Sequence, residues 1–193
     1  MTALIVTPTY NERANLPMLA AQVLARAATI EHREVMYLGL YGGMMRGGNT
    51  DSTVIVADAP ISSPPIVSRA WVAIAMHDDY WPPVEQKLRP GSLVLVNDTT
   101  FGTTTRDDIV LHRVPATTVA ADLDNPLGGA LVMLGALCAV TGLVGIDAVV
   151  GGMRASIPSY RTQHIEANAR AIHAGWELLP ANEYPAWEVV ARA

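Results

Sequence analysis

The segment Tyr41–Asn49 carries the residue types that most clearly favour contact with a ligand or a partner. It contains four glycines around a single arginine, Arg46. Glycines let the backbone approach another molecule closely, and ordering four of them costs entropy that a simple turn does not require. The guanidinium of Arg46 and bare backbone amides could then meet an anionic group or a neighbouring subunit; a purely structural turn is the alternative. The candidate cofactor-binding or interface residues are Tyr41, Gly42, Arg46, Gly47, Gly48 and Asn49.

Three further polar groups have a chemical and a structural interpretation. His77-Asp78-Asp79 follows an apolar run and could supply an acid–base group or a metal ligand, but it also fits a helix cap. Asp122-Leu123-Asp124 resembles a metal-binding Asp-x-Asp, although the end of a short helix favours a solvated surface. Asn97-Asp98 and the threonines that follow offer hydrogen-bond donors, with a plain surface loop as the alternative; these threonines are Thr99, Thr100 and Thr103–Thr105.

The single cysteine, Cys138, limits the redox chemistry that this chain can perform. It cannot form an internal disulfide, build a zinc site or hold an iron–sulfur cluster, because each of these needs several ligands placed together. Its neighbours Leu137 and Ala139 predict a small buried side chain and no nucleophile. Any redox centre that this chain serves is therefore expected on another chain. Our predicted site includes no catalytic residue and no metal ligand.

Short apolar runs alternate with helical patterns, which predicts an α/β fold. The expected architecture is a single three-layer Rossmann-like domain over residues 1–193, with a largely parallel sheet flanked by helices. Predicted strands cover Ala3–Thr7, Val35–Leu40, Ser52–Ala57, Trp71–Met76, Leu93–Asn97 and Ile109–Val114. The first predicted helix follows a Thr9-x-x-Glu12 capping box and runs to about Ala28. A short helix is predicted near Pro83–Leu88, ending at Pro90-Gly91. The other predicted helices are Ala116–Leu123, Gly129–Val140, Ala148–Ala155 with Asp147 as its cap, and Tyr160–Leu179.

Composition excludes several classes of protein. Half of the 193 residues are hydrophobic and 16% are charged, which is incompatible with a disordered chain and indicates surface covered by a partner. The net charge of −5 gives no basic field for nucleic acid. The uncharged segment Leu127–Ile146 contains five glycines and lacks flanking basic residues, so it predicts a buried helix and no membrane span. Met1-Thr2-Ala3 does not begin a signal peptide, so we expect a cytoplasmic protein.

From Val35 onward the chain resembles the gamma component, or gamma-type domain, of 2-oxoacid:acceptor (ferredoxin) oxidoreductases, which include the pyruvate and indolepyruvate enzymes. Tyr41-Gly42 with Arg46-Gly47-Gly48 is similar to the family's Tyr-Gly-Pro-Glu-x-Arg-Gly-Gly, with Gly43-Met44 in place of Pro-Glu. Three further segments follow in the family's order as far as about Trp176. These are Lys87–Asn97, Val114-Pro115-Ala116-Thr117, and Val132–Leu137 with Thr141-Gly142-Leu143.

The resemblance implies a subunit and not a complete enzyme. In this family thiamine diphosphate and iron–sulfur clusters are held by other domains, and coenzyme A is a further ligand of some complexes. The gamma part packs on that core and helps to cover the active site during oxidative decarboxylation of a 2-oxoacid. The implied partners are alpha and beta subunits that bind thiamine diphosphate and an iron–sulfur subunit or ferredoxin, with a homodimer also open. The chain itself would bind no cofactor alone and would not catalyse alone.

The N-terminal strand-turn-helix, residues 1–34, departs from this family. The family has a Gly-x-Gly-Gly-Gln-Gly turn after its first strand, whereas this chain continues from Leu4 to Pro17 without a glycine. That segment resembles the start of nucleotide-sugar glycosyltransferases of the dolichyl-phosphate-mannose synthase type. Side chains in such a turn block the close approach of a phosphate. Two alternative functions stay open. One is a nucleotide-sugar glycosyltransferase-like protein, and the other is a non-catalytic dimeric scaffold.

Overall fold

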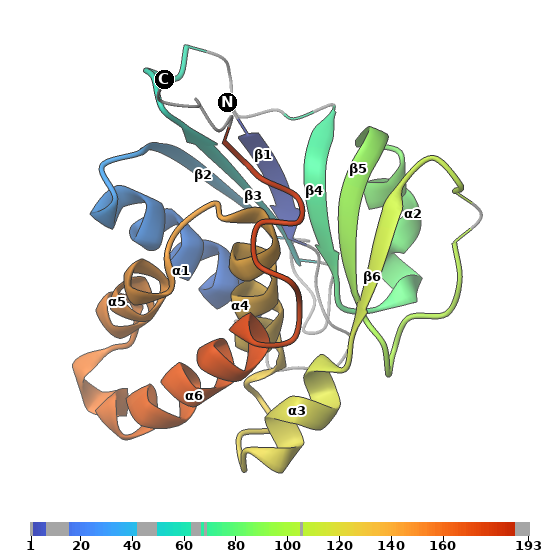
Figure 1. The fold of residues 1–193 in the computed structure, drawn as a ribbon. Coiled ribbons are helices and arrows are strands. Elements are labelled where there is room, and N and C mark those ends of the chain that lie inside the picture. The colour runs from blue at the N-terminus through green and yellow to red at the C-terminus, as the bar shows by residue number, and fades with distance from the viewer. Residues whose placement is uncertain are drawn as a thin grey trace.

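A computed structural model of the chain describes residues 2–6, 16–41, 50–62, 67, 69–104 and 106–187. Within these ranges the strands and helices alternate as expected for an α/β domain (Figure 1). The strands are β1 (Thr2–Val6), β2 (Glu34–Tyr41), β3 (Thr50–Ala57), β4 (Ala70–Ala75), β5 (Leu88–Asn97) and β6 (Val110–Val114). The helices are α1 (Leu16–Ile30), α2 (Trp81–Glu85), α3 (Ala116–Asp122), α4 (Gly129–Thr141), α5 (Ile146–Ser156) and α6 (Ile165–Trp176), with short 3-10 helices η1 (Asp78–Tyr80) and η2 (Ser159–His164).

The six strands form one sheet in the order β2-β3-β1-β4-β5-β6. Strands β1, β4, β5 and β6 pair in parallel, and β3 pairs antiparallel with both β1 and β2. The connection between β2 and β3 is too short for a crossover helix, so the two strands form an antiparallel pair. The predicted α/β fold with a largely parallel sheet is confirmed, and β3 is the strand that runs against the others.

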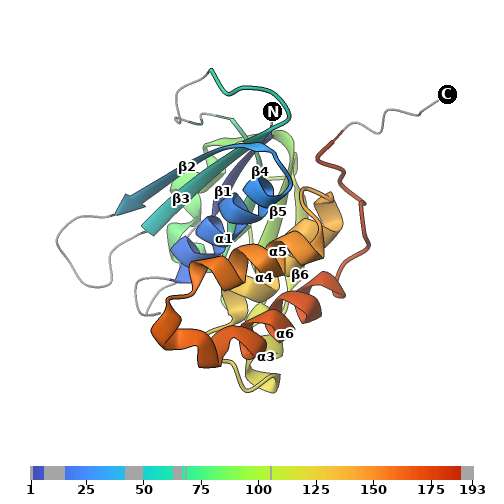
Figure 2. The ribbon, with the colours of Figure 1, turned by 90° about the vertical axis from the view of Figure 1, so that its left-hand side faces the viewer.

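Helices cover one face of the sheet in two tiers (Figure 2). Helix α1 packs on β2 and β3, and α5 and α6 pack outside α1 and α4. Every residue of α4 is buried, because this helix packs against α6 on one side and against the core that covers the sheet on the other. The predicted buried helix is confirmed: α4 ends before Gly142, which adopts the left-handed φ of 57° that closes a helix. Among the described helices, none is both long and apolar enough to cross a membrane.

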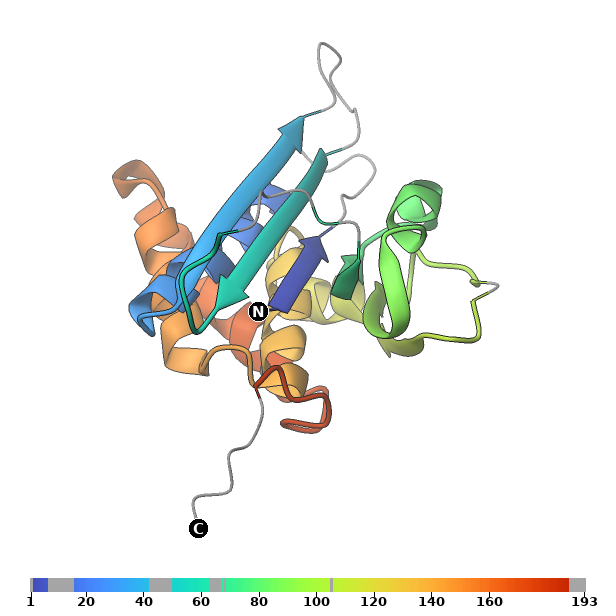
Figure 3. The ribbon, with the colours of Figure 1, turned by 90° about the horizontal axis from the view of Figure 1, so that it is seen from above.

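The opposite face of the sheet is covered over β4 and β5 by α2 and the connection that follows β5. Ala73, Ala75, Val94 and Val96 point to this face and form a second, smaller core. Trp81 from α2 meets Phe101 edge to face, with ring centroids 5.4 Å apart. Figure 3 shows α2 on the far side of the sheet from the main helical layer. The flanking layers are therefore unequal in size.

Two helix contacts depend on the absence of a side chain. A Cβ on Gly175 of α6 would lie 1.9 Å from the carbonyl oxygen of Val132 in α4, and a Cβ on Gly135 would lie 2.1 Å from that of Ile172. Both distances are far below contact between real atoms, so α4 and α6 meet backbone to backbone. Gly152 of α5 has a similar role, since its Cβ would lie 2.6 Å from the Val23 carbonyl oxygen of α1.

The C-terminal segment 177–187 consists of turns and bends and crosses the end of α4. Asn182, Tyr184 and Ala186 donate their backbone amides to the carbonyls of Ala139, Val140 and Thr141, at 2.9, 2.8 and 2.7 Å. A helix leaves its last four carbonyls without an intrahelical partner, and Gly142 satisfies the remaining one at Cys138. The segment therefore completes the hydrogen bonding of α4.

The predicted boundaries of helices α2, α5 and α6 and of strand β5 are wrong. Helix α6 begins at Ile165, because Arg161 within η2 has a non-helical φ of −123°. Pro90-Gly91 does not end a helix but lies inside β5, with Gly91 at a φ of 75°. Helix α5 begins at Ile146, and the carboxylate of Glu31 accepts a 2.6 Å bond from the Gly145 amide in place of the predicted Asp147 cap. The Thr9-x-x-Glu12 capping box lies outside the described residues.

Candidate functional site

The carboxyl ends of the parallel strands form one edge of the sheet, which we call the carboxyl edge. Strand pairing places Gly39, Ser52, Val6, Ile74, Leu95 and His112 on one continuous rung from β2 to β6. Two residues further along, the end of β2 at Tyr41 is level with Asn97 at the end of β5. The segment between Tyr41 and Thr50 therefore leaves and rejoins the sheet at the carboxyl edge, where ligands bind in open α/β folds.

The predicted site residues lie at this edge or outside the described part of the chain. Tyr41 is the last residue of β2 and pairs with Thr50 of β3. Gly42, Arg46, Gly47, Gly48 and Asn49 fall in the range 42–49, outside the described residues. That these residues form a binding or interface site stays a prediction. The structure shows where the segment leaves and rejoins the sheet, at Tyr41 and Thr50.

The neighbours β1 and β4 mark the point where the chain switches between the faces of the sheet. They are paired in parallel, yet α1 after β1 covers one face, and η1 and α2 after β4 cover the other. In open α/β sheets, ligands commonly bind at such a switch point. His77-Asp78-Asp79 follows β4 after one intervening residue, Met76, and so lies at the carboxyl end of that strand.

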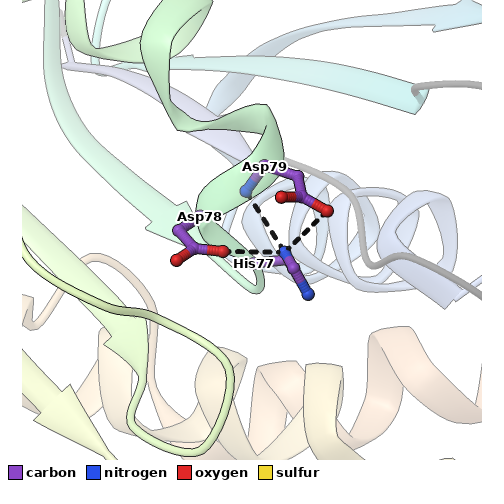
Figure 4. Close-up of side chains that lie close together, drawn as sticks. All are labelled: His77, Asp78 and Asp79. Carbon is purple, nitrogen blue, oxygen red and sulfur yellow. Dashed lines mark hydrogen bonds and ion pairs between the residues drawn. The ribbon is translucent and has the colours of Figure 1, made fainter.

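Figure 4 shows that His77, Asp78 and Asp79 converge on the Nδ1 atom of His77. Nδ1 lies 3.2 Å from the Asp79 amide, which donates to it, and 3.0 Å from Asp78 Oδ1. His77 thus caps η1 by accepting this bond at Nδ1. The carboxylates of Asp78 and Asp79 are exposed by 45% and 61%. The interpretation as a helix cap is confirmed, and the cluster has the donor types but not the enclosure of a metal site.

Asn97 joins three elements at the carboxyl edge. Its side chain is 1% exposed, and Nδ2 donates to the hydroxyls of Thr100 and Thr117 at 2.8 Å each. Its Oδ1 accepts the Thr117 amide at 3.3 Å, so it serves as the missing cap of α3, where Pro115 offers no side-chain cap. The Thr100 hydroxyl in turn donates to the carbonyl of Met76 after β4. The expectation of a plain surface loop is wrong for Asn97.

We expect Asn97→Ala to lower the free energy of unfolding by about 2 kcal/mol, because buried donors and acceptors lose their partners at three elements. Thr99→Ala is the matched control, since Thr99 is exposed and makes one 3.3 Å contact with Asn97 Oδ1. Its expected effect is below about 0.5 kcal/mol. Urea denaturation of both variants measures the difference, and equal effects would contradict the assigned role of Asn97.

Most of the remaining polar candidates are exposed to solvent. Asp122 ends α3 and Asp124 follows with a left-handed φ of 54°, and both are exposed. The solvated helix end is thus confirmed over a metal-binding Asp-x-Asp. Thr103 is exposed, and Thr104 donates to the Glu85 carboxylate of α2 at 2.6 Å. Thr105 lies outside the described residues.

Cys138 is fully buried inside α4, as predicted. Burial, assisted by the negative charge of Glu31, raises the pKa of its thiol far above the ordinary range. We therefore expect the native chain to resist thiol reagents at pH 8, and to label in parallel with global unfolding when urea is added. Labelling with Ellman's reagent under native conditions at the rate of a free thiol would contradict this.

The described residues define a Rossmann-like domain whose carboxyl edge carries the buried Asn97 and its threonine partners, and whose single thiol is buried inside α4. The family model for pyruvate ferredoxin/flavodoxin oxidoreductase matches residues 18–178. The chain therefore belongs to the pyruvate ferredoxin/flavodoxin oxidoreductase family, and its predicted identity as a gamma-type component of an oxidoreductase is confirmed.

Individual proteins agree with this assignment. The chain is 26% identical over 165 residues to the 2-oxoglutarate synthase subunit KorC of Methanocaldococcus jannaschii, covering 83% of this chain and 86% of the relative. It is 29% identical over 163 residues to the pyruvate synthase subunit PorC of Methanothermobacter marburgensis, covering 83% and 89%. Its fold matches the keto/oxoacid ferredoxin oxidoreductase gamma subunit of Geobacter sulfurreducens with a TM-score of 0.75 at 20% identity, over 92% of this chain and 97% of that one.

The family match begins at residue 18, after the segment that resembles glycosyltransferases. Strand β1 from that segment nevertheless takes a central place in the sheet, between β3 and β4. Residues 7–15, which contain the turn without glycine, lie outside the described residues. The N-terminal strand therefore fits the fold of the family although its sequence departs from it.

Proposed function

We propose that this chain packs, through the carboxyl edge of its sheet, on the subunits that form the active site of a 2-oxoacid:ferredoxin oxidoreductase. The observation that carries the proposal is the register of the sheet, which attaches segment 42–49 to β2 and β3 at the same edge where β1, β4 and β5 end. Tyr41, Gly42, Arg46, Gly47, Gly48 and Asn49 then belong to the surface that meets the partner or its anionic ligand.

The chemistry of this chain supports a covering role. Its single thiol is buried, so iron–sulfur clusters must be held by a partner or by ferredoxin. Thiamine diphosphate supplies the carbanion chemistry of 2-oxoacid decarboxylation when it is bound in the complex. The contribution of this chain is to enclose that site, to exclude water, and to place a guanidinium near the negatively charged substrate or coenzyme A.

The substrate is a 2-oxoacid, since KorC is a subunit of 2-oxoglutarate synthase and PorC of pyruvate synthase. The chain is similarly close to KorC and PorC, at 26% and 29% identity, so 2-oxoglutarate and pyruvate are both candidate substrates. Assays of the purified complex with pyruvate and with 2-oxoglutarate, using ferredoxin or a viologen dye as acceptor, separate the two. The proposed site of action is the cytoplasm.

The test of membership is co-purification. Tagged chain co-expressed with the products of neighbouring genes should bring down subunits that contain thiamine diphosphate and iron–sulfur clusters, and the preparation should be brown. If the tagged chain remains alone and colourless with every candidate partner, the proposal of a covering subunit fails.

The test of the site is Arg46→Ala in the assembled complex. We expect turnover to fall by roughly tenfold or more, as when a charged contact to an anionic group is lost. Arg161→Ala is the control, because Arg161 is an exposed arginine of η2. The melting temperature of the isolated chain should stay the same in both variants. A large loss of stability in Arg46→Ala would instead favour the structural turn.

The glycosyltransferase alternative gains no second observation. The metal pair that a glycosyltransferase needs has no counterpart in Asp122 and Asp124, which lie at the exposed end of α3. Calorimetry with manganese and a nucleotide sugar should therefore show no binding.

A further inference from the structure

The connection between β5 and β6 is described over residues 98–104 and 106–109, and each of its ends is bound by one arginine. Because the two strands are parallel, the connection starts at the carboxyl edge and returns to the opposite edge of the sheet. Arg113 of β6 binds its first part at the carboxyl edge. Arg106 binds its last part beside the start of β5, where the Gly91 amide donates to the Asp108 carbonyl at 2.7 Å.

Arg113 donates three hydrogen bonds to residues 98–102, which we call the edge segment. Nη1 donates to the Asp98 carboxylate and to the Phe101 carbonyl at 3.1 Å each, and Nη2 donates to the Gly102 carbonyl at 2.5 Å. The planar fork of an arginine fits several fixed acceptors at once, whereas a lysine ammonium is a single point charge. Arg113 therefore fixes the path of the edge segment.

The edge segment is also bound to the residues that follow β4. The Thr100 hydroxyl donates to the Met76 carbonyl, and the Asp78 amide donates to the Thr100 carbonyl at 3.4 Å. The Gly102 amide donates to Asp78 Oδ2 at 3.3 Å. Asn97 adds the cap of α3. These bonds join the segments that follow β4, β5 and β6 into one unit at the carboxyl edge.

The same bonds leave two polar side chains on the outside of the edge segment. Asp98 and Thr99 are exposed, and the Asp98 side chain is 50% exposed although it is paired with Arg113. Holding exposed polar groups in one conformation costs entropy, and ordering them in advance lowers the cost of binding a partner. A rigid polar segment at the edge where ligands bind is therefore suited to contact with another molecule.

We infer that Arg113 is a positioning residue of the oxidoreductase complex. It holds the edge segment in the conformation in which Asp98 and Thr99 meet hydrogen-bond donors of the subunit that binds thiamine diphosphate. The inference rests on the proposed function, in which the carboxyl edge packs on that subunit. It adds residues of the described chain to a contact that otherwise consists of Tyr41 and segment 42–49.

The first test is Arg113→Met in the purified complex, because methionine keeps a long side chain and makes none of the three hydrogen bonds. We expect kcat/KM for the 2-oxoacid to fall by about tenfold, mainly through a higher KM, since small displacements of positioning groups have effects of this size. The KM for the electron acceptor should stay the same, because the acceptor reacts at clusters that other subunits hold. A purely structural defect would lower the fraction of intact complex, and with it kcat, without changing either KM.

Arg106→Met is the matched control at the other end of the connection. Arg106 donates to the Asp108 carboxylate at 2.5 and 2.7 Å and to the Glu85 carbonyl at 2.8 Å. The control therefore removes as many hydrogen bonds as Arg113→Met, but away from the carboxyl edge. Its KM for the 2-oxoacid should equal that of the wild type, even where its melting temperature falls.

The second test separates the contact from the order of the edge segment. Asp98→Ala leaves the two carbonyl contacts of Arg113 in place, so the amides of Phe101 and Gly102 should keep their wild-type hydrogen exchange in the isolated chain. In Arg113→Met the same two amides should exchange faster, while those of α4 keep their protection. The KM for the 2-oxoacid should rise in both variants, because one loses the contact group and the other its position.

Three results would overturn the inference. These are a wild-type KM in Asp98→Ala, a wild-type KM in a folded Arg113→Met, or an equal rise of KM in Arg106→Met. If Arg113→Met does not fold, Asp98→Ala decides alone. Failure of the wild-type chain to co-purify with thiamine diphosphate-binding subunits would instead refute the proposed function, before any variant is compared.

Discussion

Gly175→Ala should lower the free energy of unfolding by roughly 3 kcal/mol, although alanine is the better helix former by about 1 kcal/mol. The new methyl carbon would stand 1.9 Å from the Val132 carbonyl oxygen and 2.7 Å from its carbon. Both atoms belong to the backbone of α4, so no side chain can rotate away. Helices α4 and α6 must separate, and the fully buried α4 then loses contacts along its length.

The measurement is a thermal melt with circular dichroism. For a chain of this size a loss of 3 kcal/mol lowers the melting temperature by roughly 6–12 °C. Gly151→Ala is the control, since its Cβ would meet only the Cδ1 atom of the half-exposed Ile30, at 3.2 Å. That variant should be neutral or stabilising by up to about 1 kcal/mol. If Gly175→Ala and Gly151→Ala lower the free energy of unfolding equally, the close contact between α4 and α6 is not the reason that position 175 is a glycine.

The elements that the sequence predicted well are those set by local patterns. The continuous apolar run of α4, followed by Thr141-Gly142, marks both the burial of this helix and its left-handed end. Cys138 within the run is buried for the same reason. Helix α6 kept its apolar spacing at Ile165, Ala169 and Ile172, but Tyr160 points to solvent and the turn before it is not α-helical. The spacing of apolar residues identified the buried face of α6 but not the residue at which this helix begins.

The features that the sequence could not predict depend on contacts between distant segments. Asn97 is a cap for α3 only because β5 ends beside Thr117, and no local signal joins two residues so far apart. The Glu31 carboxylate reaches the Gly145 amide in the same way. The composition of segment 41–49 indicated a contact with another molecule, but the level of its attachment, opposite Asn97, follows from the pairing of five strands. Alternating apolar residues define the two faces of a strand and not its register with a neighbour.

Deletion of residues 180–193 should lower the free energy of unfolding by at least about 3 kcal/mol. The deletion removes the three amides that satisfy the carbonyls of Ala139, Val140 and Thr141. It also removes Tyr184 and Trp187, which pack against the main core. The Trp187 ring lies under the guanidinium of Arg33 at 4.0 Å and donates Nε1–H to the Leu143 carbonyl at 3.0 Å.

Two further variants separate the contributions. Deletion of residues 188–193 leaves all of these contacts in place and should change stability by less than about 0.5 kcal/mol. Trp187→Phe keeps an aromatic ring but loses the hydrogen bond to Leu143, with an expected cost of about 1 kcal/mol. If the long and short deletions unfold at the same urea concentration, segment 177–187 does not stabilise α4. If only the long deletion is unstable, the stability of α4 depends on a segment that begins more than thirty residues after the helix ends.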